Sequence, residues 1–432
     1  MLSRRELLGA LTIPAVGALG AVLLPGRAAA VARELATDPG APEELAGDEV
    51  FWREVQQAFT VDRSLVNLNN GGVSPAPAIV QEAMKGHLDY SNEAPPYTMW
   101  QVLEPQREGV RQRLARQFGC DAEEIALTRN ASEGLQICQL GLDLEPGDEI
   151  LTTTQDYPRM LNTFRQRERR DGIALRQIEL PTPAENPAEV VALFERALTP
   201  RTRVILMCHV INLTGQILPV RDVVRMARRH DVPVIVDGAH SFAHFPFRHE
   251  DLECDYFATS LHKWLFAPHG TGLLYVRRDR IPGLWPLMAA AVEQDADIRK
   301  FEEIGTHPAA NHLAIAEALT FHQGLGAERK LARLVWLRDR WARRLAEHDR
   351  VLLYTSLRPG FAGGIATVGF EGVDTTALAE HLWNAHRILV VAIDHPQIDG
   401  LRVSPSVYTT PEEIDRFTDA VERVLRDGLP GA

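Results

Sequence analysis

The segment Asp255-Tyr256-Phe257-Ala258-Thr259-Ser260-Leu261-His262-Lys263-Trp264 changes character halfway along its length. Its apolar half predicts a buried strand, and its polar half presents Lys263 just beyond the end of that strand. Most lysines are exposed, so the simplest interpretation is a surface residue. The alternative is an amine that bonds covalently to a ligand held at the end of the strand. The rest of the sequence has to distinguish these two interpretations.

Strands and helices alternate along the chain on the N-terminal side of this segment. Helices are predicted at 187–198 and 220–230, between short apolar runs that are typical of buried strands. This alternation indicates an α/β fold with a mainly parallel sheet between two layers of helices. The runs predicted as strands are 125–128, 149–152, 173–178, 203–209 and 232–237.

The pattern changes after Pro308. A long basic helix is predicted at 328–347, and the remaining chain mixes strand-like and helical segments. The strand-like segments are 351–354, 365–370 and 388–393, and the helices are 375–386 and 411–425. We therefore predict an N-terminal segment at 31–75, a large ligand-binding domain at 76–315 and a small α+β domain at 316–432.

The first thirty residues have the features of a targeting signal. Ser3-Arg4-Arg5-Glu6-Leu7-Leu8 is a twin-arginine pattern, and small residues suited to cleavage lie at 25–30 after a mildly apolar run. This predicts a signal peptide at 1–30, recognition by the twin-arginine translocon, and a periplasmic or exported protein. An uncleaved membrane anchor is the alternative, which Pro14 and the glycines of the run disfavour.

Composition and cysteine usage exclude several classes of protein. The 432 residues are 45% hydrophobic and 24% charged, as in ordinary globular proteins, and the net charge of −12 argues against nucleic acid as a partner. The spacing of Cys120, Cys138, Cys208 and Cys254 matches no metal-binding or CxxC pattern, so no metal site is expected. Cys138 and Cys208 lie in apolar runs and are predicted to be buried.

Two predicted strand ends offer contacts for a phosphate group. Ala131 and Ser132 begin a helix, where free backbone amides and a hydroxyl suit an anion. Ser260 and His262, beside Lys263, can bind the same group. Taken alone, Ser132 is better interpreted as a plain helix cap.

Asp237 closes the apolar strand at 232–236, and His240 follows it. A carboxylate at the end of a buried strand is costly without a cation, and the protonated ring nitrogen of pyridoxal phosphate is such a cation. Lys263 would then be the Schiff-base lysine and the base that moves a Cα proton. The alternatives are a capping or metal-binding aspartate and a structural histidine.

Two further positions suit a substrate. Arg402 is predicted to open a short strand in the small domain, where its guanidinium can bind a substrate carboxylate through two hydrogen bonds, although a surface arginine is the simpler interpretation. The strand near Val66 ends in the turn 69–72, whose glycines allow backbone to approach a ligand closely. We expect Asn70 in this turn to contact the substrate.

In combination, these motifs resemble one family. Four motifs occur in the family's order: Asn-Ala-Ser-Glu-Gly at 130–134, Asp-Gly-Ala-His at 237–240, Ser-Leu-His-Lys-Trp at 260–264, and Arg-Val-Ser at 402–404 with Tyr-Thr-Thr at 408–410. The chain from about residue 60 onward resembles class V aminotransferase-like enzymes of fold-type I, which use pyridoxal 5'-phosphate, and is most similar to the isopenicillin N epimerase-like branch.

The resemblance implies a role for each matching residue. Lys263 would form the Schiff base, Asp237 would contact the pyridine nitrogen, and His240 and Asn212 would lie near the cofactor's phenolic oxygen. The residues that would hold the phosphate are Ala131, Ser132, Ser260 and His262.

Three more positions follow from the same resemblance. Tyr157 matches the family's ring-stacking residue, where many relatives have histidine; tyrosine can stack, but acid–base help from it is in doubt. Thr306, in Gly305-Thr306, matches a loop that reaches a neighbouring subunit's phosphate, which implies a homodimer with shared active sites. Arg402 would bind the α-carboxylate of the substrate.

The motifs are shared by several reactions at the Cα of an amino acid or of an amino-acid-bearing peptide or secondary metabolite. Transamination and epimerisation are the leading predictions, and carbon–sulfur cleavage is the alternative. Cysteine desulfurases need a cysteine shortly before the substrate arginine, and 383–401 contains none, so a desulfurase is not expected. An exported binding protein that retains the fold without catalysis is the rival from another class.

Overall fold

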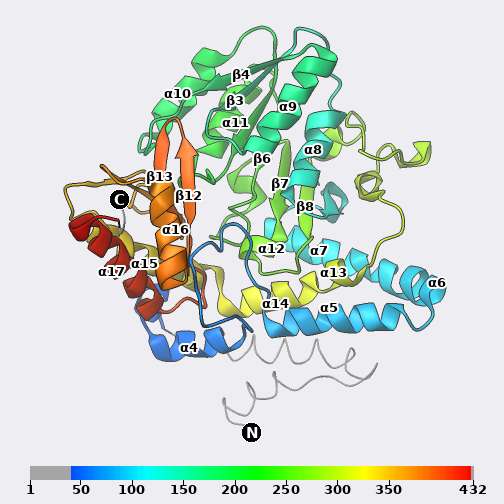
Figure 1. The fold of residues 1–432 in the computed structure, drawn as a ribbon. Helices are drawn as coiled ribbons and strands as arrows, with labels where there is room; N and C mark the ends of the chain where they lie inside the picture. The colour runs from blue at the N-terminus through cyan, green and yellow to red at the C-terminus, as the bar shows by residue number, and fades with distance from the viewer. Residues whose placement is uncertain (1–39, 430–432) are drawn as a thin grey trace.

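The structure is a computed structural model that describes residues 40–429, arranged as a large domain and a smaller C-terminal domain (Figure 1). The predicted signal peptide at 1–30 lies outside these residues, so cleavage and export stay predictions. Within the described range, no helix is long and apolar enough to cross a membrane.

The large domain is built on a seven-stranded sheet with strand order β2-β8-β7-β6-β5-β3-β4. Only β8 runs antiparallel to its neighbours, which confirms the predicted mainly parallel sheet and the fold class. Its strands are β2 (Ile125–Thr128), β3 (Glu149–Thr153), β4 (Ala174–Ile178), β5 (Thr202–Cys208), β6 (Val234–Asp237), β7 (Tyr256–Ser260) and β8 (Gly272–Val276).

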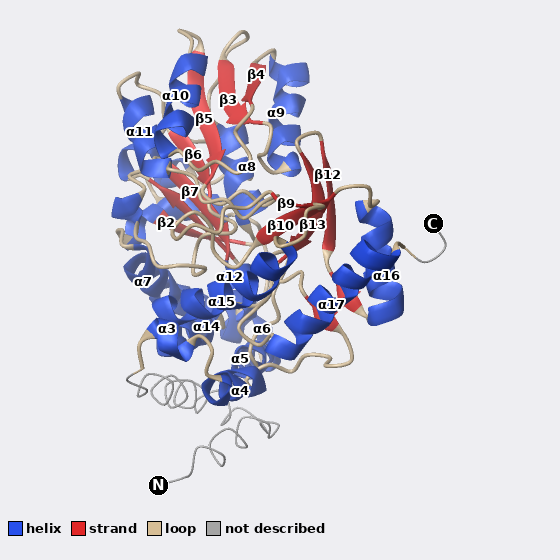
Figure 2. Ribbon diagram, turned by 90° about the vertical axis from the view of Figure 1, so that its left-hand side faces the viewer, coloured by secondary structure: helices blue, strands red, loops and turns tan. Residues whose placement is uncertain are grey.

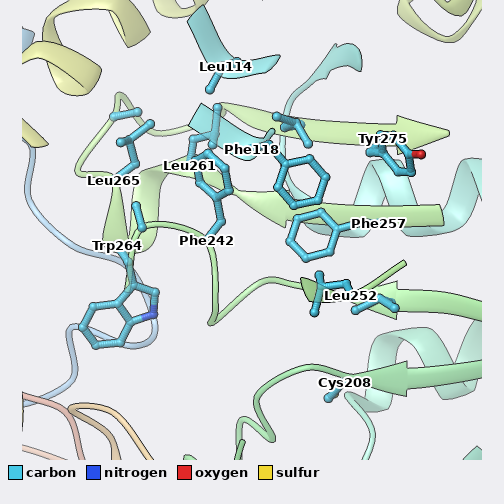
Figure 3. Packing of buried hydrophobic residues seen from close by; sticks show 14 of the residues in the cluster. Leu114, Phe118, Cys208, Phe242, Leu252, Phe257, Leu261, Trp264, Leu265 and Tyr275 are labelled. Atoms are coloured by element: carbon cyan, nitrogen blue, oxygen red, sulfur yellow. The ribbon is translucent and has the colours of Figure 1, made fainter. Parts of the chain in front are cut away.

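Helices cover both faces of this sheet, as the apolar strands require. Successive residues of a strand point to opposite faces, so Phe257 packs in the core beneath α7 while its neighbour Ala258 packs beneath α8. The rings of Phe118 and Phe257 stack with centroids 4.7 Å apart (Figure 3). Figure 2 shows α10 and α11 on one side of the sheet and α9 on the other. These helices are α7 (Arg107–Phe118), α8 (Ala131–Gly141), α9 (Pro158–Asp171), α10 (Pro187–Ala197) and α11 (Val220–Arg228).

The small domain contains an antiparallel four-stranded sheet of order β12-β13-β10-β9. Its elements are β9 (Val351–Leu353), β10 (Ala366–Phe370), β12 (Val391–His395), β13 (Ile398–Val403), α15 (Ala327–Leu345), α16 (Thr375–His386) and α17 (Pro411–Asp427). The N-terminal segment joins this domain, because β1 (Val66–Asn67) pairs in parallel with β11 (Ile388–Leu389). The long helix α15 contributes Leu334 to the core of the large domain and Leu337 to that of the small one.

The remaining helices lie along the lower edge of the large domain in Figure 1 or connect the two domains. The helix predicted from Asp48 is present, and the Asp48 carboxylate caps it by accepting the amide of Val50 at 2.9 Å. These helices are α3 (Pro42–Leu45), α4 (Glu49–Gln57), α5 (Ala78–Ser91), α6 (Pro95–Tyr97), α12 (Leu261–Trp264), α13 (Ala310–Leu313) and α14 (Ile315–Leu325).

Three local predictions were wrong. Residues 95–100 of the predicted loop 92–100 are helical, because Pro95 and Pro96 occupy a first helical turn, where a missing N–H costs little. The strand β8 was not predicted, and the single strand expected at 388–393 is two strands that belong to different sheets. Such sheet membership depends on partners far away in the sequence.

Candidate active site

The carboxyl ends of the parallel strands and the start of α8 enclose a cavity of about 380 Å³ between the two domains. All the predicted site residues except Asn70 and Thr306 line it, together with Asn130, Arg159 and Cys208. Open α/β sheets bind ligands at this edge. The fold therefore brings together residues that are far apart in the sequence, such as Gly71 and Arg402, which are 331 positions apart.

The first turn of α8 forms one end of the cavity. Asn130 caps the helix by accepting the amide of Glu133 at 2.9 Å, and Ser260 Oγ accepts the amide of Ala131 at 3.0 Å. The remaining amides of this turn have no partner within the helix, which suits a phosphate group. Burial lowers the pKa of His262 to about 4, and its Nδ1 lies 3.2 Å from the Thr271 carbonyl oxygen. Without a ligand, His262 is therefore neutral and donates through Nδ1 to Thr271, which leaves its Nε2 as an acceptor; donation from Nε2 to a phosphate requires that the imidazole gain a proton.

Asp237 lies on the floor of the cavity at the end of β6. One carboxylate oxygen accepts the amide of Ala239 at 2.9 Å. Burial raises the pKa of Asp237 to about 6, and the charge of Lys263 opposes this rise. A buried carboxylate with so few contacts calls for a cation, and the protonated ring nitrogen of pyridoxal phosphate fits that requirement.

Lys263 projects into the cavity from the short helix α12. Its Nζ lies 3.2 Å from His240 Nε2. Burial lowers the pKa of Lys263 to about 8, and the nearby Asp237 partly counteracts the effect. A lysine with this pKa gives up its proton near neutral pH, as a Schiff-base nucleophile must. Burial also holds the pKa of His240 well below its ordinary value, so this imidazole is neutral.

The pH dependence of cofactor uptake tests this environment. We expect the cofactor-free protein to take up pyridoxal phosphate faster as the pH rises through about 8, because only neutral Lys263 attacks the aldehyde. Stopped-flow absorbance at several pH values would measure the rate. A rate that rises only above the ordinary pKa of a lysine would contradict the low pKa.

Arg402 reaches the cavity from β13, and it is the penultimate residue of that strand instead of the opening residue that we predicted. Its two terminal nitrogens each donate a hydrogen bond of 3.0 Å, one to the backbone oxygen of Asn212 and one to Asn69 Oδ1. Its Nε is buried and has no partner among residues 40–429. Burial lowers the pKa of Arg402 to about 10, so the guanidinium remains charged and is held in place for a carboxylate.

The structure separates Asn70 from the cavity. Its side chain donates to the Ser404 carbonyl at 3.1 Å and accepts from the Tyr408 hydroxyl at 2.6 Å, so it fastens the turn to the small domain. The neighbouring Asn69, which contacts Arg402, was not predicted. Sequence alone could not choose between two adjacent asparagines, because the choice depends on how the turn meets β13.

Thr306 lies in a second hollow, lined by residues such as Trp100, Arg107 and Glu302. We predicted that Thr306 contacts the phosphate site of a neighbouring subunit. Its position outside the cavity of its own chain is compatible with this contact, which stays a prediction.

Tyr157 and Arg159 border the cavity at the start of α9. Tyr157 is the N-cap residue, and Pro158 occupies the first turn, which places Arg159 at the rim. Arg159 is exposed and forms no ion pair within the described part of the chain. It was not predicted as a site residue, and only its place beside a cavity distinguishes it from the other arginines of this helix.

Residues 66–417 match the family model described as Aminotransferase class-V. The chain belongs to this family. It is 31% identical over 396 residues to the isopenicillin N epimerase of Streptomyces clavuligerus, covering 86% of this chain and 98% of that protein. It is also 27% identical to a cysteine desulfurase of Haloferax volcanii, covering 83% and 89% of the two chains.

Among solved structures, the fold matches a lysine mutant of the protein C-DES that has glycine covalently linked to its PLP cofactor. The TM-score is 0.75 and the identity 26%, covering 84% of this chain and 98% of that one. The family, this neighbour and the fit of the cavity agree that the cofactor of the class V protein is pyridoxal phosphate. The roles assigned to single residues stay predictions.

Proposed function

We propose that this class V enzyme transfers a proton at the Cα of an amino acid, or of a peptide or secondary metabolite that carries one, as an epimerase or aminotransferase. The observation that supports this most is the placement of Lys263, Asp237 and Arg402 around one cavity. Similarity over nearly the full length of an isopenicillin N epimerase supports the epimerase reading.

Each residue has a distinct part in this proposal. Bound pyridoxal phosphate supplies an electron sink for the negative charge left at Cα. Arg402 binds the substrate carboxylate, which orients the Cα–H bond toward Lys263. Lys263, with a pKa near 8, then holds and moves the proton. Asp237 stabilises positive charge at the far end of the cavity.

Incubation with candidate amino acids in deuterated water tests the reaction type. Epimerisation is expected to give deuterium at Cα with both configurations, and transamination to give a keto acid, both measurable by NMR. A cofactor-loaded protein that exchanges no Cα proton in any of a broad set of amino acids and short peptides would contradict the proposal.

Carbon–sulfur cleavage is the second candidate, because cysteine desulfurases are among the relatives. The segment 383–401 has no cysteine, and the only cysteine that lines the cavity in the described chain is Cys208. Burial raises the pKa of the Cys208 thiol well above its ordinary value, which makes it a poor nucleophile. Cleavage without a persulfide on the enzyme therefore remains the alternative, and release of sulfide from cysteine would favour it.

Charge in the cavity indicates a preference among substrates. The cavity is lined by three basic side chains and one carboxylate: Arg159, Lys263 and Arg402, and Asp237. The positive ring nitrogen of the bound cofactor would balance the charge of this carboxylate. We expect Arg159→Ala to raise KM for substrates with a second acidic group about fivefold to tenfold and to leave KM for alanine nearly unchanged.

Steady-state kinetics with paired neutral and acidic substrates would measure this preference. Arg165→Ala is the matched control, since Arg165 lies on the same helix, is exposed and does not line the cavity. Equal changes of KM for both substrate types would contradict the expectation.

We also propose a homodimer in which Thr306 completes the partner's active site, and export through the twin-arginine pathway. The homodimer is proposed from the family resemblance and from the position of Thr306 outside the cavity that its own chain forms. Export is proposed from the sequence at 1–30. Light scattering and fractionation of cells would test them separately.

A further inference from the structure

The turn that follows Lys263 is held in an unfavourable backbone conformation. The helix α12 has only four residues, and its carbonyl groups find partners outside it: that of Leu261 accepts the amide of Ala267 at 3.2 Å, and that of His262 accepts the amide of Ser74 at 3.2 Å. Two residues after Trp264, Phe266 has φ of 61°, in the left-handed region that bulky residues rarely adopt. Such strain persists only where surrounding contacts hold it.

Lys330 supplies those contacts from helix α15. Its side chain is fully buried, and its Nζ donates a hydrogen bond to the Trp264 carbonyl oxygen. The same Nζ lies 3.9 Å from the centroid of the Phe266 ring, so the amine also packs on the face of this ring. Lys330 thus binds both the end of α12 and the strained residue behind it.

The burial of Lys330 is costly, and the described chain provides no carboxylate that offsets the cost. Burial holds the pKa of Lys330 well below its ordinary value. A methionine would fill similar space without burying an amine. The amine donates its hydrogen bond to the carbonyl of Trp264, the residue next to Lys263. This contact indicates that the amine keeps the turn after Lys263 in place.

His244 holds the same turn from the other side. Its ring stacks on Trp264 with centroids 3.8 Å apart and an angle of 8° between the planes. Its Nδ1 lies 2.8 Å from the His240 carbonyl oxygen, and its Nε2 accepts the amide of Gly364 at 2.7 Å. Trp264 is therefore fixed by a ring stack and by the bond from Lys330, while Figure 3 shows it beside Leu261 and Leu265.

We propose that Lys330 is a positioning residue for Lys263. By holding the carbonyl of Trp264 and the ring of Phe266, its amine fixes the turn from which Lys263 reaches His240 and the cofactor. The inference depends on the proposed function only in that Lys263 bonds to the cofactor.

A double-mutant cycle on cofactor affinity tests this role without measuring turnover. Lys330→Met is made in the natural protein and in Lys263→Ala, and the Kd for pyridoxal phosphate is measured for all four by titration of the cofactor-free proteins. We expect Lys330→Met to weaken binding about tenfold when Lys263 is present and less than about twofold when it is absent. The visible absorbance of the bound cofactor should also titrate at a shifted pH in Lys330→Met.

Lys300→Met is the matched control. Lys300 is likewise buried, donates to the Asp295 carbonyl at 2.8 Å and lies 5.2 Å from the ring of Phe301, so its contacts lie away from the turn that follows Lys263. It should change neither the affinity nor the pH midpoint.

Equal losses of affinity with and without Lys263 would overturn the proposal and leave Lys330 a purely structural residue. Lys330→Gln is measured in the same cycle as a second variant, because its amide keeps a hydrogen-bond donor toward Trp264. The test can therefore be completed even if Lys330→Met folds poorly. We expect this variant to show a smaller coupling than Lys330→Met, and no coupling in either variant would overturn the proposal. A protein that shows the coupling but exchanges no Cα proton would contradict the proposed function and not this inference.

Discussion

Replacing Lys263 with alanine should lower turnover by at least about 10³-fold, the largest effect expected for any single substitution in the chain. On the proposed function, the variant loses both the amine that bonds to the cofactor and the base that moves the Cα proton, and acid–base catalysis alone contributes about 10²–10⁴-fold. The first turn of α8, which would hold the phosphate, does not involve this amine, so the variant should still bind pyridoxal phosphate, though more weakly.

Borohydride reduction followed by mass spectrometry of peptides would check the chemistry directly. The natural protein should carry the reduced cofactor on Lys263, and Lys263→Ala should carry none. Lys300→Ala serves as the control, because it removes a buried amine away from the cavity. Labelling of a different lysine, or retention of full activity by Lys263→Ala, would refute the assignment.

Asp237→Asn should have opposite effects on stability and on activity. Burial raises the pKa of Asp237 in the folded cofactor-free protein to about 6, from an ordinary value of 3.8. The folded state thus binds this proton more tightly than the unfolded chain, and stability falls as the pH rises from about 4 to about 6. At pH 7 the ionised carboxylate lowers the free energy of unfolding by up to about 3 kcal/mol, since each unit of pKa corresponds to about 1.36 kcal/mol.

Removing this charge should therefore stabilise the cofactor-free protein at pH 7 and have little effect at pH 3. In the cofactor-loaded protein, the same change would remove the partner of the ring nitrogen, and we expect turnover to fall about 10²–10³-fold, which corresponds to about 3–4 kcal/mol of lost transition-state stabilisation. Urea unfolding at the two pH values and steady-state rates would measure both effects. A variant that is less stable than the natural protein at pH 7 would contradict the role of burial.

Much of the site could be predicted because its residues stand at strand ends in recognisable order. Asp237 after an apolar strand and Lys263 after Phe257 and Ala258 place both side chains at one edge of a parallel sheet, whatever the details of packing. Ala131 and Ser132 are similarly fixed by the start of α8. Their convergence follows from local pattern together with the rule that parallel strands share an edge.

Contacts between distant segments could not be predicted in this way. Asn69, instead of Asn70, reaches Arg402 because β1 pairs with β11 and Asn69 then pairs with Ser404, the residue that follows β13. A one-residue change in such pairing exchanges the two side chains, and the sequence contains no signal that fixes it.

The sequence by itself determined the layered α/β architecture and the places of Lys263 and Asp237 at the ends of neighbouring strands, because strand–helix alternation and residues at strand ends are local properties of the chain. Only the tertiary structure decided what surrounds Lys263. In the sequence, Lys330 is one more basic residue of a basic helix, and His244 is a histidine without a distinguishing pattern. Only the packing of the folded chain places both against Trp264. Burial, which lowers the pKa of Lys263 to about 8 and raises that of Asp237 to about 6, arises from the closure of two domains and cannot be seen along one strand.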